Sequence, residues 1–215
     1  MAIIKHKNQR VGIFIDTQNL YHSAKNLYKS KVNFGNVMKE ALAGRILVRA
    51  VAYVIRTESE EEKGFFDALN KLGIETKIKD IRIFAGGAKK ADWDLGMAID
   101  AITMAEKLDV VVLGTGDGDF VPLIEYLHSK GCQAEVIAFG KSAAGQLREA
   151  ADDFVDLCDN PKNYLINYRG ASSGGVRSYI PGFGSHTPEA ISSTDEEGID
   201  VGTEIYEDGE DEAAG

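Results

Sequence analysis

Acidic side chains flank apolar runs at three places in this sequence. Asp16 ends the run VGIFID, Asp92 and Asp94 stand at the start of a helical pattern, and Asp117 and Asp119 lie in TGDGDF after VVVLG. Two carboxylates about 4 Å apart repel by roughly 4 kcal/mol at an effective dielectric constant of about 20. Clustered acids therefore need a cation, and a hard divalent ion fits because it prefers carboxylate and water oxygens. If the fold brings these residues together, they predict a site for Mg²⁺ or Mn²⁺.

Each of these acids also has an ordinary structural explanation. Asp16 and Asp119 each precede a predicted helix and could cap it, Asp92 or Asp94 could cap the helix that follows, and Asp117 is a typical turn former. Taken singly, these explanations are as good as a functional one. Their joint occurrence where a parallel sheet opens its ligand site favours function.

Other kinds of site find less support in the sequence. The residues that could bind zinc or form disulfides are scattered, namely His6, His22, His128, His186, Cys132 and Cys158. GTGDGD lacks the glycine spacing of a dinucleotide loop, and its carboxylates would repel a pyrophosphate. A haloacid-dehalogenase-like phosphatase would need a second acid two residues after Asp16, where this sequence has Gln18.

Strand and helix patterns alternate from residue 10 to residue 157. The predicted strands are Val11–Ile15, Ile46–Ile55, Ile74–Ile78, Val110–Leu113 and Gln133–Phe139, with short ones at Ile81–Ala85 and Phe154–Leu157. The predicted helices are Asn19–Tyr28, Phe34–Ala43, residues 64–72, Ala91–Lys107, Phe120–Lys130 and Ala143–Ala151. This alternation predicts an α/β fold with a doubly wound, mainly parallel sheet and helices on both faces.

Two of the predicted helices carry further signals. Ser59 and Glu62 form a capping-box pattern before the helix at 64–72, and Gly73 ends that helix. In the helix at 91–107, Leu95, Ile99, Ile102 and Ala105 follow amphipathic spacing. Asp100 lies about 120° around this helix from Asp94 and therefore ranks below it as a site residue.

The sheet topology decides whether the acids meet. In doubly wound sheets, ligands bind beyond the carboxyl ends of the strands, where the strand order reverses. If the first and fourth strands are neighbours, Asp16 and Asp117 face each other across that point. Gly114, Gly116 and Gly118 then give the backbone room to approach a ligand.

Charge divides the 215-residue chain into two parts. Residues 170–215 contain eleven acidic residues and one basic residue, whereas residues 1–169 contain 23 of each. We therefore expect a folded domain at 1–169 and a disordered acidic tail at 170–215. The sequence has no apolar run of membrane-spanning length and no apparent secretory signal, which predicts a cytoplasmic protein.

Three motifs together resemble one known family. FIDTQNLY (14–21), KKADWDLGMAIDA (89–101) and GTGDGDFVPLIEYLHSKG (114–131) resemble the NYN domain, in the LabA-like bacterial branch of the PIN-like nuclease superfamily. The resemblance covers roughly residues 10–157. It implies a PIN-like, Rossmannoid fold. It also implies a metal-dependent ribonuclease, specifically an endoribonuclease, that uses Mg²⁺ or Mn²⁺.

The resemblance carries over residue by residue. Asp16, Asp94, Asp117 and Asp119 match the catalytic acids, and Asp92 matches an additional metal ligand. The pair Asp117 and Asp119 lies in a motif whose usual form is SGDSDF, so Thr115 keeps the first hydroxyl and Gly118 loses the second. The expected substrate-binding residues are Asn19, Thr115, Lys89 and Lys90.

The resemblance implies RNA, single-stranded or structured, as the partner, and a homodimer as an assembly that such domains form. Further candidates for RNA contact are Lys25, Lys29, Lys31, Lys141, Arg148, Tyr21 and Trp93, although a lone Trp beside an apolar helix face is also typical of a core residue. Two alternatives stay open. One is a weakly active or inactive module that binds RNA or protein through the same groove, and the other is a regulatory scaffold that acts through the tail.

Overall fold

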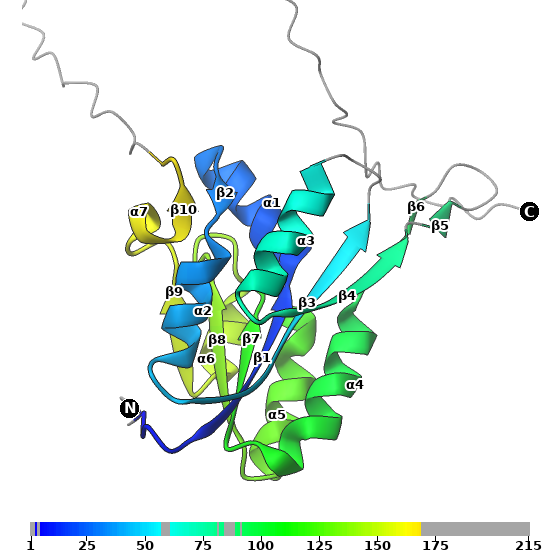
Figure 1. Ribbon diagram of the computed structural model, residues 1–215. Helices are drawn as coiled ribbons and strands as arrows, with labels where there is room; N and C mark the ends of the chain where they lie inside the picture. The colour runs from blue at the N-terminus through cyan, green and yellow to red at the C-terminus, as the bar shows by residue number, and fades with distance from the viewer. Residues whose placement is uncertain are drawn as a thin grey trace, which may run out of the picture. The chain divides into compact units, whose positions relative to one another are not determined.

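A computed structural model describes residues 3, 5–56, 61–80, 82–83, 89–90 and 92–168, without the side chains of 61–63, 82–83 and 89–90. Its centre is a six-stranded sheet in the order β4-β3-β1-β7-β8-β9, with every neighbouring pair parallel (Figure 1). The strands are β1 (Arg10–Asp16), β3 (Ile46–Arg56), β4 (Glu75–Asp80), β7 (Val110–Gly114), β8 (Gln133–Ala138) and β9 (Asp153–Asp156). The predicted α/β fold with a doubly wound parallel sheet is confirmed.

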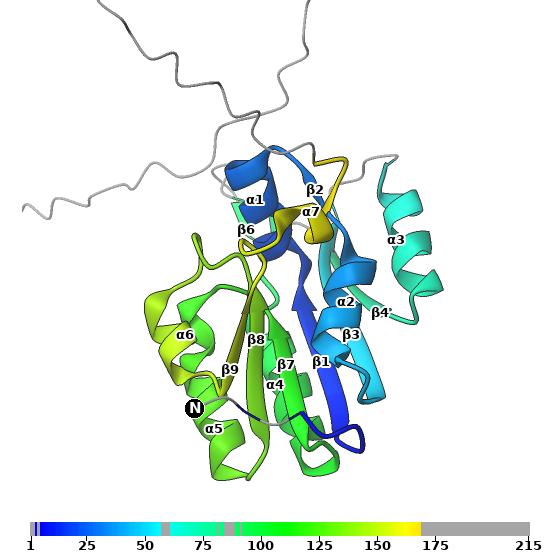
Figure 2. The same ribbon diagram turned by 90° about the vertical axis from the view of Figure 1, so that its left-hand side faces the viewer.

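Helices cover both faces of this sheet, as Figure 2 shows. One face packs against α1 (Thr17–Tyr28), α2 (Phe34–Leu42), α3 (Glu61–Lys71) and the short α7 (Pro161–Tyr164). The other face packs against α4 (Asp94–Met104), α5 (Val121–Ser129) and α6 (Gly145–Ala150). None of the helices in the described ranges is long and apolar enough to cross a membrane.

Two small antiparallel pairs and two 3₁₀ turns complete the described structure. The pairs are β2 (Lys31–Val32) with β10 (Leu165–Ile166), and β5 (Arg82–Ile83) with β6 (Lys89–Lys90), and the 3₁₀ turns are η1 (Ala105–Lys107) and η2 (Gly118–Phe120). Strands β2, β6 and β10 were not predicted, because two residues are too few to show a period. The predicted strand at Ile81–Ala85 contains β5, whereas Ile81, Phe84 and Ala85, the capping residue Ser59, the Glu62 side chain and the tail at 170–215 lie outside what the structure describes.

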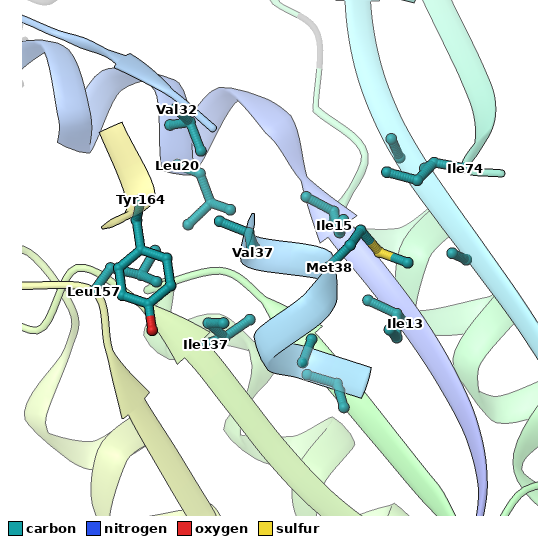
Figure 3. Close-up of a cluster of buried hydrophobic side chains, with 14 of the residues drawn as sticks. Ile13, Ile15, Leu20, Val32, Val37, Met38, Ile74, Ile137, Leu157 and Tyr164 are labelled. Carbon is teal, nitrogen blue, oxygen red and sulfur yellow. The ribbon is translucent and has the colours of Figure 1, made fainter. Parts of the chain in front are cut away.

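The central strands are apolar because both of their faces are buried. Ile13 and Ile15 of β1 point into the core under α1 and α2, which Figure 3 shows, whereas Phe14 points into the core under α4 and α5. All three side chains are fully buried. Burial of each such side chain contributes about 1.5–3 kcal/mol. The continuous apolar runs in the sequence therefore identified β1 and β7 correctly as interior strands.

Helix α4 differs from its predicted form in bounds and in orientation. It begins at Asp94 and ends at Met104, inside the predicted range of 91–107. Its apolar stripe points outward, because the exposed fractions of Leu95, Ile99 and Ile102 are 72%, 52% and 38%. Met97 and Ala101 occupy the buried face instead, with exposed fractions of 1% and 0%. Amphipathic spacing identified the helix but not the face that packs.

Candidate active site

The acids meet at the point where the strand order reverses. Strand β1 lies between β3 and β7. The strand order runs outward through β3 and β4 on one side of β1, and through β7, β8 and β9 on the other. Ile15 pairs with Gly114, the last residue of β7. Asp16 and the turn that begins at Thr115 therefore lie at the same edge of the sheet, where the strands have their carboxyl ends. This edge is the usual ligand site of this topology. The expected pairing of the first and fourth main strands is confirmed.

Asp16 caps a helix and also contributes charge to this edge. Its Oδ1 accepts a hydrogen bond of 3.0 Å from the backbone N–H of Asn19, at the N-terminus of α1. The pKa of Asp16 is raised to about 6, chiefly by burial and also by the negative charges of Asp94 and Asp117, whereas hydrogen bonds from the backbone of Asn19 and Gln18 act to lower it. The structural and the functional explanations of this residue therefore hold together.

The turn after β7 holds Asp117 by short polar contacts. The hydroxyl of Thr115, which is fully buried, accepts a hydrogen bond of 3.2 Å from the backbone N–H of Asp117. Asp117 Oδ1 in turn accepts one of 3.0 Å from the backbone N–H of Asp119, at the start of η2. The side chain of Asn19 reaches across from α1, and its Oδ1 accepts a hydrogen bond of 2.8 Å from the N–H of Gly116. Asn19 thus ties the Asp16 loop to the Asp117 turn.

Asp94 brings the helix on the opposite face of the sheet to the same place. It is the first residue of α4, and the preceding Trp93 occupies the N-cap position without a side-chain cap. Burial raises the pKa of Asp94, and so do the charges of Asp117, Asp92 and Asp119. The predicted acids therefore share one electrostatic environment, and neither Asp92 nor Asp94 caps the helix by its side chain.

Lys79 lies near the acids and is not among the predicted site residues. Its charge lowers the pKa of Asp94, its Nζ donates to the backbone carbonyl of Asp92, and it lies 4.5 Å from the centre of the Trp93 ring. Lys77 and Lys79 alternate along β4, so they lie on the same face of the sheet. In the sequence, this alternation of lysines near the end of a strand is the signal that could have indicated Lys79 as a site residue.

Asp100 belongs to a separate network. Its carboxylate accepts hydrogen bonds of 2.5 Å from the Tyr53 hydroxyl and of 2.6 Å from Lys77 Nζ. Burial acts to raise the pKa of Asp100, but these two bonds lower it below its ordinary value. Because Asp100 is bonded to Tyr53 and Lys77, it is a weaker candidate for the site than Asp94.

Trp93 has structural contacts. Its Nε1 donates a hydrogen bond of 3.0 Å to the carbonyl of Val54, and its ring lies 5.5 Å from that of Tyr53. A Cβ on Gly96 would lie 2.7 Å from the Trp93 ring, so a glycine is needed for this packing. These contacts and the Lys79 ammonium hold the ring in place at the start of α4, where it is partly buried against the core under α4 and α5.

The predicted basic residues differ in what they contact. Lys89 and Lys90 form strand β6, and their side chains lie outside the described part. Arg148 donates a hydrogen bond of 3.1 Å to Asp156 and stacks on Phe154, so it is engaged with β9. Lys141 is exposed.

At Gly118, the space that a side chain would fill is occupied by Gln146. A Cβ built on Gly118 would lie 2.5 Å from Nε2 of Gln146 and 3.1 Å from the Cβ of Ala144. The amide of Gln146 therefore occupies the space above this position of the turn. The sequence indicated the loss of a hydroxyl here but not the group that takes its place.

The donor chemistry of the site fits a hard divalent cation. Asp16, Asp94 and Asp117 supply carboxylate oxygens only and make no ion pair within the described residues. In the described part of the chain, no three His, Cys, Asp or Glu side chains are grouped closely enough to hold a metal by themselves. Mg²⁺ commonly keeps several waters and takes only one or two carboxylates, so the acids suit it with water between some of them and the ion.

Comparison with known proteins identifies relatives across most of the chain. The NYN domain family matches residues 10–158. The Low amplitude and bright protein LabA of Synechococcus elongatus is 30% identical over 161 residues, which cover 70% of this chain and 84% of LabA. A crystal structure of a protein of unknown function from Vibrio parahaemolyticus is also similar, with a TM-score of 0.69 and 28% identity over 76% of this chain and 100% of that chain.

The family match spans all three acidic motifs, which lie at the switch point of the parallel sheet. The similarity to LabA and to the Vibrio protein extends over 84% and 100% of those chains. The chain therefore belongs to the NYN domain family, in its LabA-like group, within the PIN-like nuclease superfamily.

Proposed function

We propose that this protein is a metal-dependent ribonuclease that hydrolyses RNA phosphodiester bonds internally, with Mg²⁺ or Mn²⁺ as its cofactor. The observation that carries the proposal is the meeting of Asp16, Asp94 and Asp117 at the switch point, where burial and mutual repulsion raise the pKa of Asp16 and Asp94. A fold keeps such a costly arrangement where function requires it.

In this proposal each acid has a role. Asp16, Asp94 and Asp117 would hold the ion directly or through water, and Asp92 and Asp119, both exposed, would contribute from the rim. Asp119 also donates its backbone N–H to Asp117, so it orients that carboxylate. When bound, the ion would supply a lowered pKa for an attacking water and neutralise charge on the scissile phosphate.

The surrounding polar residues would position these acids and the RNA. Asn19 joins the two acidic loops through its bond to Gly116, and the buried Thr115 orients the backbone of Asp117. The charge of Lys79 acts on Asp94, and it would also attract a phosphate. Lys89 and Lys90, which precede the acidic start of α4 in the chain, remain proposed phosphate contacts.

A binding module without cleavage is the second candidate. The observation in its favour is that no three of the described acids are grouped closely enough to hold a metal by themselves. Such a module would bind RNA or a protein through the same groove. It predicts RNA binding that is insensitive to the loss of the acids, because a carboxylate contributes nothing favourable to phosphate binding without a cation.

A cleavage assay tests the proposal against this alternative. Single-stranded and hairpin RNA are incubated with the protein in EDTA, Mg²⁺ or Mn²⁺, beside the double variant Asp16→Asn/Asp117→Asn. We expect internal cleavage that requires the ion and disappears in the double variant. RNA binding without cleavage in either ion would overturn the nuclease assignment and support the binding module.

We also propose the setting in which the domain works. Residues 1–169 would form the catalytic domain and residues 170–215 an acidic solubilising tail, in a cytoplasmic protein that can pair as a homodimer. The free thiols of Cys132 and Cys158 agree with a reducing compartment. Deletion of residues 170–215 should leave cleavage intact, and sedimentation at several concentrations tests the dimer.

A further inference from the structure

We infer that a basic and aromatic surface along α1 binds the phosphate backbone of the RNA segment next to the scissile bond. This α1 surface consists of Tyr21, Lys25, Lys29, Ser30 and Lys31. The inference rests on the proposed ribonuclease function, because it assigns the path of the same substrate. It assigns a binding site for a single strand of RNA outside the acidic site.

The surface is hollowed. Tyr21, Lys25, Lys29, Ser30 and Lys31 line a depression of about 230 Å³. A second depression of about 440 Å³ shares the last three of these residues and continues to Tyr28, Ile166, Asn167 and Tyr168. No acidic residue of the described chain lines either depression. The two therefore form one groove whose charged side chains are all cationic.

The groove continues from the acidic site along one helix. Helix α1 begins directly after Asp16, and Tyr21, Lys25 and Lys29 follow at intervals of four residues, which is about 6 Å each along the axis. Lys29 therefore lies roughly 20 Å along the chain direction from Asp16. In Figures 1 and 2, α1 and β2 lie at the carboxyl end of the sheet, together with the segment of α7 and β10. A strand of RNA that leaves the acids along α1 meets one cation, Lys25, in the third turn and another, Lys29, at the C-cap.

The side chains on this surface are available for such contacts. The Tyr21 side chain is 40% exposed, and Lys25 Nζ lies 5.8 Å from the centre of its ring. Lys25 and Lys29 are exposed and make no ion pair within the described residues. An exposed ring beside unpaired cations is the combination that binds single strands, because the ring stacks on a base while the cations contact phosphates.

The end of α1 is held rigidly, so the groove is preformed. Lys29 adopts the left-handed conformation with φ of 50°, and its backbone N–H bonds to the carbonyl of Lys25. The Ser30 hydroxyl donates a hydrogen bond of 2.7 Å to the carbonyl of Ile166, beside the pairing of β2 with β10. Tyr28 packs against Tyr168 at the floor, with ring centres 5.4 Å apart. A rigid groove loses little entropy when it binds its ligand.

Lysines at the end of a helix also have a simpler explanation. They interact favourably with the helix dipole, and this would account for Lys25 and Lys29 alone. It accounts neither for the exposed Tyr21 ring one turn earlier nor for the hollow that continues over Ser30 and Tyr168. The dipole explanation also predicts no effect of these lysines on RNA, which makes the two explanations separable.

The test compares RNA affinity at several salt concentrations in the full-length chain. Fluorescent single-stranded RNA is titrated with Asp94→Asn, in which cleavage is suppressed, and with the same variant carrying Lys25→Glu/Lys29→Glu. Lys107→Glu/Lys130→Glu is the matched control, because both lysines are exposed and the change in charge is the same. Lys25→Gln/Lys29→Gln serves as a milder variant if the charge reversal unfolds the protein.

We expect the α1 variants to bind at least about tenfold more weakly at low salt. Loss of two phosphate contacts should also reduce the slope of log K against log salt by about 1.4, since each contact to a single strand contributes about 0.7. Tyr21→Ala should weaken binding by about tenfold at every salt concentration, because a stacking contact is not ionic. The control should keep both the affinity and the slope.

Failure of this inference and failure of the nuclease proposal give different results. If the wild-type protein cleaves RNA but the α1 variants bind RNA with unchanged affinity and slope, the α1 surface is overturned and the nuclease stands. If the α1 variants lose affinity as expected but the wild-type protein cleaves nothing, the α1 surface is supported and the nuclease proposal fails.

Discussion

At the amino ends of the central strands, carboxylates pair with arginines, whereas at the carboxyl ends of β1 and β7 they face one another. The amino-end pairs are Arg45–Glu135 at 2.6 Å, Arg10–Asp109 at 2.9 Å and Arg49–Glu75 at 2.7 Å. Hydrogen bonds from the arginines lower the pKa of Asp109 and of Glu75. At the other end, burial and the neighbouring acids raise the pKa of Asp16 and Asp94.

The difference separates carboxylates whose charge stabilises the folded state from carboxylates whose charge destabilises it. A lowered pKa means that the folded protein stabilises the charged form, and a raised pKa means that folding opposes it. The amino-end acids are therefore explained by stability alone. The acids at the switch point cap α1 and η2, but the raised pKa of Asp16 and of Asp94 is a cost to folding that a neutralising cation would remove.

The largest effect is expected for the buried pair at the amino end. Arg45 and Glu135 are almost fully buried, so Glu135→Gln leaves a buried guanidinium without its counter-charge. We expect the free energy of unfolding to fall by about 3–5 kcal/mol in urea denaturation. Glu75→Gln, which breaks an exposed pair, should cost less than about 1 kcal/mol. Equal costs for the two variants would remove burial as the reason for the difference.

The next effect concerns cleavage rather than stability. Asp94→Asn removes a carboxylate at the switch point, and we expect kcat/KM for RNA to fall by at least about 100-fold, since charge stabilisation by a held ion is worth several kcal/mol. Asp109→Asn changes the same kind of residue at the amino end and should leave cleavage unchanged. If Asp94→Asn cleaves as fast as the wild-type protein, Asp94 has no part in the site.

A pH dependence of stability distinguishes Asp16 from the paired acids. Because its pKa is about 6 in the folded protein against an ordinary 3.8, ionisation opposes folding, and stability falls as the pH rises from about 4 to about 6. Asp16→Asn can still cap α1 but does not ionise. In EDTA, we therefore expect this variant to gain about 2 kcal/mol over the wild-type protein between pH 4.5 and pH 8.

Urea denaturation at the two pH values measures this gain, and Mg²⁺ provides an independent readout. An ion that binds the folded state should stabilise the wild-type protein at pH 8 and leave Asp16→Asn nearly unaffected. A constant difference between the two proteins at both pH values would show that neither burial nor the neighbouring acids destabilise the charged form of Asp16.

The smallest effect is expected at the turn that holds Asp117. A side chain at Gly118 must displace Gln146, whose Nε2 would lie 2.5 Å from the new Cβ. We expect Gly118→Ser to lower the free energy of unfolding by less than about 1 kcal/mol, because the end of a long side chain moves easily. Combination with Gln146→Ala should restore it. An additive double-mutant cycle would show that the two residues do not interact.

Much of this architecture is readable in the sequence because its signals are local. The apolar runs of β1 and β7, the left-handed Gly73 after α3 and the alternation of strands with helices each depend on a few neighbouring residues. The parallel topology follows from that alternation, and it places acids that follow β1 and β7 at one edge. The sequence therefore determined the sheet and which acids stand at its open end.

The tertiary structure decided which partner each side chain has. Lys79 acts on Asp94, Tyr53 and Lys77 engage Asp100, and the stripe containing Leu95 points away from the core. These outcomes depend on contacts between strands and helices that are far apart in the chain. Amphipathic spacing and residue type are properties of one segment, whereas burial and charge pairing are properties of two segments that meet, so only the folded chain fixes them.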